Sequence, residues 1–314
     1  MTTGLLHRPA GTLATKDADA HLTPDDAGWA YSGLDVITLA AGASRPLVTG
    51  GAEFAVLPLS GSVIVEVGAH RYVLEGRDSV FTRVTDWAYL PIDTDARLST
   101  MTGCEIALPS ARATRRFDPA WMPAASVSIE IRGAGPATRQ VNNFMSPEVF
   151  DGADKLMCVE LLTPDGNWSS YPPHRHDGLD VGDGSTCVVN NEEIYFFRIG
   201  RTGRRAPSAE GFGMHRTYTV DGDIDANVVV RDGDVFLVPR GYHGPCIAAP
   251  GYPMYYLNVL AGPGGERSMA FCDDPTHHWV RDAWATMATD PRVPMTGIDE
   301  PQPDRPDDRP KDHV

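Results

Sequence analysis

The chain has 314 residues, of which 42% are hydrophobic and 22% are charged, a composition typical of globular proteins and unlike that of disordered ones. There are 27 lysines and arginines against 42 aspartates and glutamates, so the formal net charge is −15. Because no run of basic residues exceeds two, this acidity argues against binding to nucleic acid or to an anionic membrane surface.

The cysteines and the apolar segments bear on where the protein resides. Its five cysteines are scattered and form no CxxC pair, which disfavours a disulfide scaffold and a four-thiolate zinc site. The N-terminal residues contain no apolar segment typical of a secretory signal, and no apolar run approaches the ~20 residues of a membrane span. We therefore expect a cytoplasmic protein, with two core units in a chain of this length.

The first half of the chain is rich in short β-type segments separated by turn residues. Segments 53–59 and 62–67 flank the pair Ser60-Gly61 and predict a β-hairpin. Further strands are expected at 70–74, 79–81, 87–91, 97–100, 104–108 and 126–131. Short strands at this spacing favour a β-sandwich or barrel over alternating β-α-β units.

The second half repeats this pattern and adds one helical segment. Strands are expected at 156–163, 193–199, 216–220, 227–230, 234–239, 246–248 and 254–261. The segment VRDGDVFLVP is weakly similar to LEGRDSVF followed by WAYLP in the first half, which indicates two related β units. Helical periodicity is best at 277–287, whereas the Pro-rich, charged segment 299–314 predicts a disordered tail.

Two histidines stand two positions apart in the segment YPPHRHD. If this segment is extended, His174 and His176 project to the same face and point both imidazoles at one site. Glu193 begins a predicted strand, and His243 follows a Gly-Asp strand that ends in proline. Three imidazoles and one carboxylate suit a divalent ion such as zinc, iron, manganese, nickel or cobalt. An octahedral ion held in this way keeps open positions and can act as a Lewis acid.

The order of these motifs, HxH, then Glu, then G-D-x-x-x-x-P, then His, resembles the two metal-binding motifs of the cupin superfamily. More narrowly, the chain closely resembles the 5-deoxy-glucuronate isomerase family of myo-inositol catabolism in the segments YPPHRHD, EEIYFFRI, GDVFLVPRGYHGP, YPMYYLNVLAGP and DDPTHHWVRDAW. The resemblance extends from about residue 39 to residue 284 and is densest over 168–284. The 5-keto-4-deoxyuronate isomerases of pectin breakdown share the fold and the metal pattern but fewer of these segments.

The resemblance implies a tandem cupin fold, an all-β architecture of two jelly-roll barrels at residues 1–135 and 136–298. The first unit has no HxH motif and no histidine after the segment 87–91, so we expect only the second unit to bind metal. The implied reaction is the aldose–ketose isomerisation of 5-deoxy-D-glucuronate to 5-dehydro-2-deoxy-D-gluconate through an enediol or enediolate. It implies one divalent ion, zinc, manganese or iron, and neither nicotinamide nor flavin.

Other functions are compatible with the same motifs. An iron-dependent cupin dioxygenase uses a similar ligand set, and oxygen uptake would distinguish it from an isomerase. A non-catalytic cupin for ligand binding or storage usually lacks the ligands. A dehydrogenase is disfavoured because no GxGxxG follows a predicted strand.

The spacing of the ligands departs from the minimal cupin motif. Glu193 lies 17 positions after His176 (193 − 176), whereas the minimal motif places its glutamate only a few residues after HxH. The intervening segment 177–191 is rich in Gly and Asp, and both a mobile lid and a plain surface loop are open, with the lid favoured. Glu192, on the other face of the strand, is the rival ligand and is otherwise expected to be solvated or to support a ligand.

Several residues near the motifs could move the proton or contact the sugar. Tyr195 shares the strand face of Glu193 and is expected either to reach the substrate or to fill the core. His215, where the family often has glutamine, and Tyr256 are further acid–base candidates, as is a metal-bound hydroxide. Tyr218 is a candidate substrate contact.

A substrate carboxylate requires a cation, and arginine offers it planar, bidentate geometry. Arg216 and Arg240 are favoured for this role over Arg198 and Arg139, while Arg175 is expected to alternate away from the ligands. The expected partner is a small sugar acid, with no nucleic acid and no membrane, and a homo-oligomer is left open.

Overall fold

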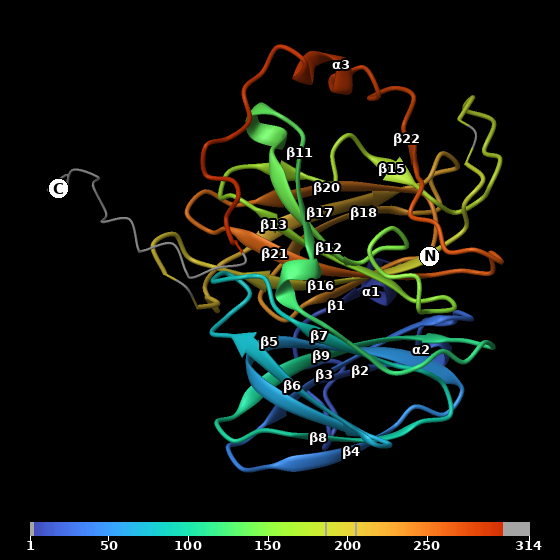
Figure 1. Ribbon diagram of the computed structural model, residues 1–314. Coiled ribbons are helices and arrows are strands. Elements are labelled where there is room, and N and C mark those ends of the chain that lie inside the picture. Colours follow the sequence, from blue (N-terminus) through green and yellow to red (C-terminus); the bar gives the residue numbers. More distant parts are fainter. Residues whose placement is uncertain (1–2, 186, 205, 298–314) are drawn as a thin grey trace, which may run out of the picture.

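The computed structural model describes residues 3–185, 187–204 and 206–297, and nearly all of its regular structure is β (Figure 1). The helical elements are short: α1 (Thr3–Leu6), α2 (Pro24–Ala27), α3 (Val280–Trp284) and the 3-10 turns η1 (Ala124–Ser126) and η2 (Gly135–Ala137). The expected all-β fold with few short helices is thereby confirmed. The predicted tail, 299–314, lies outside the described residues.

One nine-stranded sheet occupies the lower part of Figure 1 and comes from the first half of the chain. Its path is β10-β7-β5-β9-β3-β2, and three further strands pair beside this path. The strands are β2 (Ala20–Leu22), β3 (Ser32–Leu39), β4 (Ser44–Val48), β5 (Ala52–Val67), β6 (His70–Arg77), β7 (Trp87–Leu90), β8 (Asp95–Ser99), β9 (Cys104–Arg112) and β10 (Ala120–Met122). Because β5 pairs with β6, β7, β8 and β9 along its length, the sheet curls around an apolar cluster of its own.

The hairpin expected around Ser60-Gly61 is wrong, because β5 is one continuous strand of 16 residues. The register of β5 shifts against β9 between Pro58 and Ser60, and against β6 between Gly61 and Val63. Gly61 has a φ of +74°, and a Cβ there would lie 2.2 Å from the carbonyl oxygen of Gly103. The pair is therefore a bulge that bends a long strand, and glycine is needed for both its conformation and its close approach.

The strand expected at 79–81 is also wrong, because these residues form a turn. Thr82 donates its backbone N–H to the carbonyl of Ser79 at 3.1 Å, and its hydroxyl donates to the same oxygen at 2.7 Å. Such local bonds compete with strand pairing. The strand expected at 126–131 begins later, at Ser128, because the preceding residues form η1.

Helix α3 is shorter than the helix expected at 277–287. None of its five residues is buried, so no apolar face packs it against the sheets. A short helix gains little stability without such packing. The residues before it form turns, in which His277 and His278 donate their N–H groups to the carbonyl of Asp274 at 3.0 Å.

Two sheets of the second half occupy the upper part of Figure 1. The seven-stranded sheet follows the order β1 (His7–Arg8), β19 (Val235–Val238), β16 (Glu192–Ile199), β21 (Met254–Ala261), β13 (Met157–Thr163), β12 (Arg139–Met145) and β11 (Ser128–Arg132). The six-stranded sheet contains β18 (Asp225–Val230), β17 (Gly213–Tyr218), β20 (Tyr242–Ala248), β15 (His174–Arg175), β22 (Cys272–Asp273) and β14 (Trp168–Ser169). Since β1 pairs with β19, residues from the start of the chain join the second half. The division at residue 135 stays a prediction.

A shared apolar core joins the two halves. Buried side chains from the nine-stranded and seven-stranded sheets belong to one cluster. Within it, Trp87 packs edge-on against Phe144 and Phe150, with ring centroids 5.4 and 5.1 Å apart. Such aromatic contacts bury large apolar areas, so the two halves stabilise each other through the same core.

Two glutamates add polar contacts across the same junction. The buried carboxylate of Glu53 accepts backbone N–H groups at 2.6 to 2.9 Å from Asp154, Lys155 and Leu156. Glu192 accepts backbone N–H groups at 2.7 to 3.0 Å from Ala30, Tyr31 and Ser32. Glu192 therefore faces the first half of the molecule, on the opposite side of β16 from Glu193.

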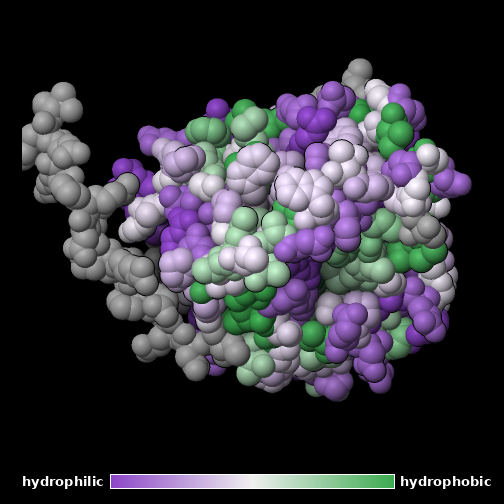
Figure 2. Space-filling model, turned by 90° about the horizontal axis from the view of Figure 1, so that it is seen from above, coloured by the Kyte–Doolittle hydropathy of each residue, from purple (hydrophilic) through white to green (hydrophobic). Residues whose placement is uncertain are grey.

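The molecular surface includes both hydrophilic and hydrophobic residues. Seen from above, hydrophilic residues are spread over the face, with hydrophobic ones between them (Figure 2). Among the described residues, no helix has the length and hydropathy needed to cross a membrane.

Candidate metal centre

The four predicted ligands lie on neighbouring elements of the upper half. His174 lies in β15 and His243 in β20, and the two residues are register partners in this antiparallel pair. His176 follows β15 directly, and Glu193 is the second residue of β16. The fold thus brings together segments that are far apart in the sequence.

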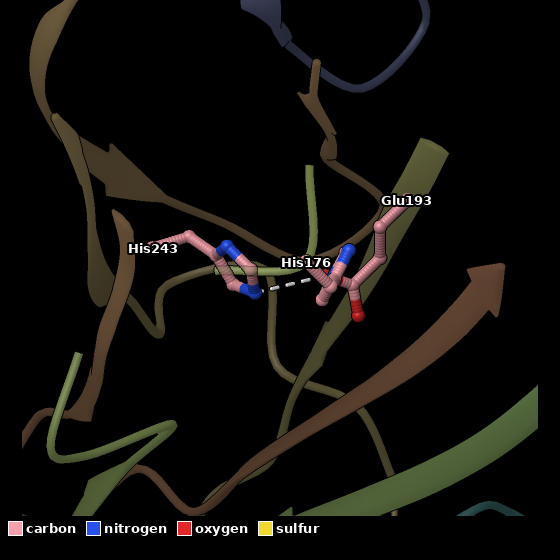
Figure 3. A group of neighbouring side chains, drawn as sticks. All are labelled: His176, Glu193 and His243. Atoms are coloured by element: carbon pink, nitrogen blue, oxygen red, sulfur yellow. Dashed lines mark hydrogen bonds and ion pairs between the residues drawn. The ribbon is translucent and has the colours of Figure 1, made fainter. Parts of the chain in front are cut away.

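Three of these side chains converge on one point (Figure 3). Nε2 of His176 is 3.0 Å from Oε2 of Glu193, and Nε2 of His243 is 3.1 Å from the same oxygen. The potential ligand atoms of the three residues lie within 4.8 Å of one another, and all three residues are buried. We call His176, Glu193 and His243 the ligand trio. His174 flanks the trio, with its ring centroid 4.5 Å from that of His243.

The long spacing between His176 and Glu193 is closed by backbone contacts. Asn191 donates its N–H to the carbonyl of His176 at 2.8 Å, and Asp177 forms an antiparallel bridge with Asn190. The loop between Asp177 and Asn190 therefore begins and ends at neighbouring backbone positions. This explains how 17 positions of sequence still bring both ligands to one point.

The trio is strongly coupled by charge. Burial opposes ionisation of Glu193, but His243 and His176 outweigh it and hold the pKa of this carboxyl well below its usual range. Burial also opposes protonation of His176, but its hydrogen bond to Glu193 raises the pKa of His176 above the ordinary value. In His174, burial and the neighbouring His243 lower the pKa well below the ordinary value, so this imidazole is neutral.

The donor atoms fit a metal ion. Nε2 of His243 is buried and has no hydrogen-bond partner among the described residues, although it points toward the Glu193 carboxylate. A buried polar atom without a partner is unfavourable, and a cation between the imidazoles and the carboxylate would satisfy it. Two or three imidazoles with one carboxylate are typical ligands of zinc, iron and manganese.

The centre borders a cavity of about 560 Å³, within the size range of ligand pockets. His174, His176 and Glu193 line this cavity, whose wall also contains residues of β21, β13, β12 and β11. Its wall also includes Arg132, Arg139 and the residues 268–271. We call it the central cavity. A small polar molecule could therefore reach the trio from inside this half of the molecule.

The tyrosine candidates lie next to the centre but behind Ser170. Tyr195 and Tyr256 are buried and stacked, with ring centroids 5.0 Å apart, and the described lining of the central cavity includes neither of them. Ser170 does line the cavity, and its hydroxyl is 2.9 Å from that of Tyr256 and 3.4 Å from that of Tyr195. Burial raises the pKa of both tyrosines above the ordinary value, so both hydroxyls keep their protons.

Ser170 is held in an unusual conformation. Its φ is +48°, a region that residues with a side chain rarely adopt. The neighbouring chain makes room for it, because a Cβ at Gly244 would lie 1.8 Å from the carbonyl oxygen of Ser170. Strained backbone of this kind clusters at functional sites.

The other predicted contacts lie outside the central cavity. His215 is buried, and its two ring nitrogens are 3.0 Å from Sγ of Cys246 and 2.9 Å from the hydroxyl of Thr217. Tyr218 donates its hydroxyl to Asp274. Both predicted residues border a second cavity of about 520 Å³.

The two favoured arginines are engaged with acidic residues at the surface. Arg216 borders the second cavity and lies 3.5 Å from Asp225. Arg240 pairs with Asp221 and Asp223 at 3.1 and 2.8 Å. Neither belongs to the described lining of the central cavity, so the structure does not bring them to the ligand trio.

Arg175 points away from the ligands, as expected, but it is buried rather than exposed. Its guanidinium donates to Asp177 at 2.5 Å, to the carbonyl of Leu179 at 2.6 Å and to Ser185 at 2.7 Å. Asp177 in turn accepts the backbone N–H of Gly241 at 2.8 Å. These contacts hold the first part of the segment 177–191 against the strand that carries His243.

Two functional candidates were missed by the sequence reasoning, Asn258 and Ser170. Asn258 donates to Oε1 of Glu193 at 2.6 Å, from the fully buried strand β21. A single amide in the otherwise apolar segment YYLNVLA was the signal that could have indicated it. For Ser170 the sequence carries no comparable signal, because its backbone conformation depends on the neighbouring Gly244.

The chain is similar to known proteins over most of its length. A family model described as the KduI/IolB family matches residues 5–280. A curated relative, the 5-deoxy-glucuronate isomerase of Geobacillus kaustophilus, is 39% identical over 264 residues, which cover 83% of this chain and 90% of the relative.

Solved structures are similar over most of the chain. An IolB-like protein from Salmonella typhimurium LT2 superposes with a TM-score of 0.77 at 30% identity, covering 88% of this chain and 98% of the other. A Bacillus subtilis oxalate decarboxylase with Mn(II) centres gives a TM-score of 0.59 at 10% identity, covering 85% of this chain and 79% of the other. The second likeness concerns the fold alone, and it agrees with the cupin resemblance of the sequence motifs.

Proposed function

Since this chain belongs to the KduI/IolB family and is an isomerase, we propose that it converts 5-deoxy-D-glucuronate to 5-dehydro-2-deoxy-D-gluconate with the help of one divalent metal ion. The observation that supports the metal-dependent part is the buried ligand trio, of which His176 and Glu193 line the central cavity. The substrate part of the proposal is supported by the curated relatives, which are named 5-deoxy-glucuronate isomerases.

The reaction moves a carbonyl by one carbon. A proton leaves the carbon beside the aldehyde, an enediol forms, and a proton is delivered to the former aldehyde carbon. Such a reaction needs stabilisation of negative charge on oxygen and a group that carries the proton. It needs no net oxidation, so neither nicotinamide nor flavin enters this proposal.

The ligand trio would hold the ion, and His174 beside it would complete the set. When bound, a divalent ion supplies a Lewis acid that polarises a carbonyl and stabilises charge on its oxygen. Glu193 is kept ionised by the two imidazoles, so it can contribute the negative charge that retains a cation. Asn258 holds the second carboxylate oxygen and fixes the orientation of the group.

A hydroxyl that faces the cavity would donate a hydrogen bond to an oxygen of the substrate. Ser170 is positioned for this role, because its hydroxyl contacts Tyr256 at 2.9 Å and the tyrosine in turn contacts Ser169. Both tyrosines keep their protons, so Tyr256 would act as a donor through Ser170 toward a substrate oxygen. The carbon-bound proton would pass to a separate base, because none of these protonated hydroxyls can accept it. His215, whose nitrogens are occupied by Cys246 and Thr217, would act by packing against Tyr195.

The decisive experiment assays two substrates with one purified protein. We expect about one divalent ion per chain, conversion of 5-deoxy-D-glucuronate without oxygen or NAD, and incorporation of deuterium from D2O or transfer of one carbon-bound proton. His243→Ala should lose the ion and the activity together. Full activity in a metal-free preparation would contradict the metal requirement, and a preference for 5-keto-4-deoxyuronate would assign the substrate to the other branch of the family.

A further inference from the structure

Arg139, the first residue of β12, is a buried cation with no carboxylate partner among the described residues. It is 3% exposed and lines the central cavity together with His176 and Glu193. Its Nη1 donates to the carbonyl of Ala137 at 3.1 Å, whereas its Nε has no hydrogen-bond partner in the described part of the chain. A buried charge without a counter-ion is unfavourable unless a ligand compensates it.

Unlike Arg139, two nearby arginines have carboxylate partners. Arg132, its register partner on β11, forms two hydrogen bonds with Glu130 at 2.7 and 2.8 Å. Arg281 is paired with Asp273, one contact being 2.7 Å. Burial lowers the pKa of Arg139 to about 10, with Arg132 and Arg281 adding to the effect and Tyr256 and Glu130 opposing it, so it remains a cation at neutral pH. Among these three arginines, only Arg139 can offer its charge to a ligand without displacing a carboxylate.

The surrounding chain is shaped to hold this guanidinium. Gly133 has a φ of +79°, and a Cβ there would lie 2.8 Å from Nη1 of Arg139 and 2.2 Å from the carbonyl oxygen of Ala137. The ring of Trp284 lies over the guanidinium, with Cζ 5.7 Å from the ring centroid. Glycine at position 133 therefore leaves the space in which Arg139 is held, and the aromatic ring restricts it further.

We propose that Arg139 binds the carboxylate of the sugar acid in the central cavity, while the ligand trio holds the end that isomerises. This inference rests on the proposed function and names the residue that recognises the charged end of the substrate. Strands β21 and β13 lie between β16, which carries Glu193, and β12, which carries Arg139. The register places Glu193 opposite Leu260 and Met157, near the end of β12, whereas Arg139 begins that strand. The two groups therefore lie at different ends of one cavity of about 560 Å³, and the substrate would extend along the cavity between them.

The acidic residues of the cavity do not oppose this assignment. Glu130 is neutralised by Arg132 and also accepts a hydrogen bond from Asn143 at 3.3 Å. Glu148 is exposed at the cavity wall, where water screens its charge. Glu130 also lies close enough to act on the charge of Arg139, and Glu193 is engaged by His176 and His243, so the buried guanidinium of Arg139 has acidic neighbours but no direct carboxylate contact among the described residues. An anionic ligand would supply that contact in the part of the cavity formed by β12.

The test compares a charged and an uncharged ligand in three variants. Arg139→Gln removes the charge, Arg139→Lys keeps it, and Arg71→Gln is the matched control, an exposed arginine of β6 that lies 3.9 Å from Glu66. We measure kinetics on 5-deoxy-D-glucuronate and on the same sugar with a hydroxymethyl group in place of the carboxylate. Isothermal titration with D-gluconate and with sorbitol supplies a readout that is independent of turnover, and thermal unfolding and metal content are recorded for every variant.

We expect Arg139→Gln to raise KM for the acid at least about 10-fold with little change in kcat, the size typical of a charge-assisted hydrogen bond. Kinetics on the uncharged sugar and binding of sorbitol should not change. Arg139→Lys should recover part of the affinity for the acid, and Arg71→Gln should resemble the unaltered protein. Because Arg139 lacks an acidic partner, Arg139→Gln should unfold at or near the temperature of the unaltered protein.

Two results would overturn the inference. Equal losses on the acid and on the uncharged sugar would assign Arg139 a structural role, as would a large fall in the unfolding temperature without any difference between the two ligands. If the unaltered protein isomerises neither sugar, the proposed function fails, and the gluconate titration still decides the role of Arg139. Equal gluconate affinity in the Gln variant and the unaltered protein would then reject it.

Discussion

Glu193 serves several partners at once. Its Oε2 contacts His176 and His243, and its Oε1 accepts a hydrogen bond from Asn258 at 2.6 Å. An amide on a fully buried strand needs a polar partner, and this carboxylate supplies it. Asn258 therefore fixes the direction in which Glu193 presents its other oxygen to the two imidazoles.

Asn258→Ala should weaken metal affinity by about 10- to 100-fold, the range typical of partners that orient a ligand. The substitution leaves the three ligands in place but releases the carboxylate of Glu193. Metal content after dialysis against a chelator of known affinity measures the effect. Asn227→Ala, at an exposed position of β18, is the control and should bind metal like the unaltered protein. Unchanged affinity in Asn258→Ala would mean that the two imidazoles alone orient the carboxylate.

The segment 177–191 is held to strand β20 by side-chain contacts. Its first part is held by the buried Arg175 and by Tyr242, whose hydroxyl donates to Asp183 and lies 3.2 Å from that of Ser185. Tyr242 adjoins His243 on β20, so the same strand anchors the segment and carries a ligand. Whether the segment closes over the cavity as a lid stays a prediction.

Tyr242→Phe should loosen this segment without affecting the metal centre. The ring remains, and only the hydroxyl contacts are lost, so amide exchange at residues 179–185 should become about 5- to 10-fold faster. Metal content should not change. Tyr72→Phe is the control, because the Tyr72 hydroxyl donates to the carbonyl of Pro119 at 3.1 Å, outside this segment. Unaltered exchange at 179–185 would show that Arg175 anchors the segment alone.

The bulge of β5 depends on the glycine at position 61. Gly61→Ala should destabilise the fold by more than about 2 kcal/mol, because it adds a clash to an unfavourable φ. Gly68→Ala is a close control, since Gly68 also has a positive φ, +55°, but a Cβ there would meet nothing within 4 Å. It should destabilise by only about 1 kcal/mol. Urea unfolding of both variants measures the difference, and equal losses would place the cost in φ and not in the close approach to Gly103.

At the scale of the whole molecule, a buried ion pair connects the halves. Arg77 of β6 pairs with Glu160 of β13, and the exposed fractions of their side chains are 0% and 1%. Tyr255 and Asn142 also donate to Glu160, at 2.9 and 3.2 Å. The two charges thus come from different halves of the molecule, and separating the halves would remove the partner of each.

Arg77→Met should destabilise the protein by about 3–5 kcal/mol, because it leaves the Glu160 carboxylate buried without its cation. The double substitution Arg77→Met with Glu160→Leu should recover a substantial part of this loss, since neither charge then remains. Chemical unfolding measures both variants. Arg71→Gln removes an exposed pair with Glu66 and should cost less than about 1 kcal/mol. A double variant as unstable as the single one would show that the partners of Glu160 depend on its carboxylate.

The net charge of −15 does not describe the local charge at the central cavity. The acidic residues lie mostly at the surface, whereas the wall of the central cavity includes His176 and Glu193 of the proposed metal site and the buried Arg139. Because buried charges are screened less than exposed ones, local cations can attract an anionic sugar into an acidic protein.

The sequence motifs indicated which side chains lie close to one another at the candidate site. The motifs around His176, Glu193 and His243 grouped three residues that lie together in the structure, with His174 beside them, and their role as metal ligands stays a prediction. Arg216 and Arg240 were favoured because they adjoin the same motifs. The structure places them on the outer side, where Asp221, Asp223 and Asp225 engage them.

The sequence by itself indicated the β-rich fold class, the family and the candidate metal ligands, because alternation along a strand and local motif order are properties of neighbouring residues. Only the tertiary structure decided which groups face the cavity. The bulge at Gly61, the conformation of Ser170 and the contact of Asn258 with Glu193 all depend on chain segments that are distant in sequence. For the same reason Arg139 could not be preferred over other arginines, since its lack of an acidic partner follows from long-range packing.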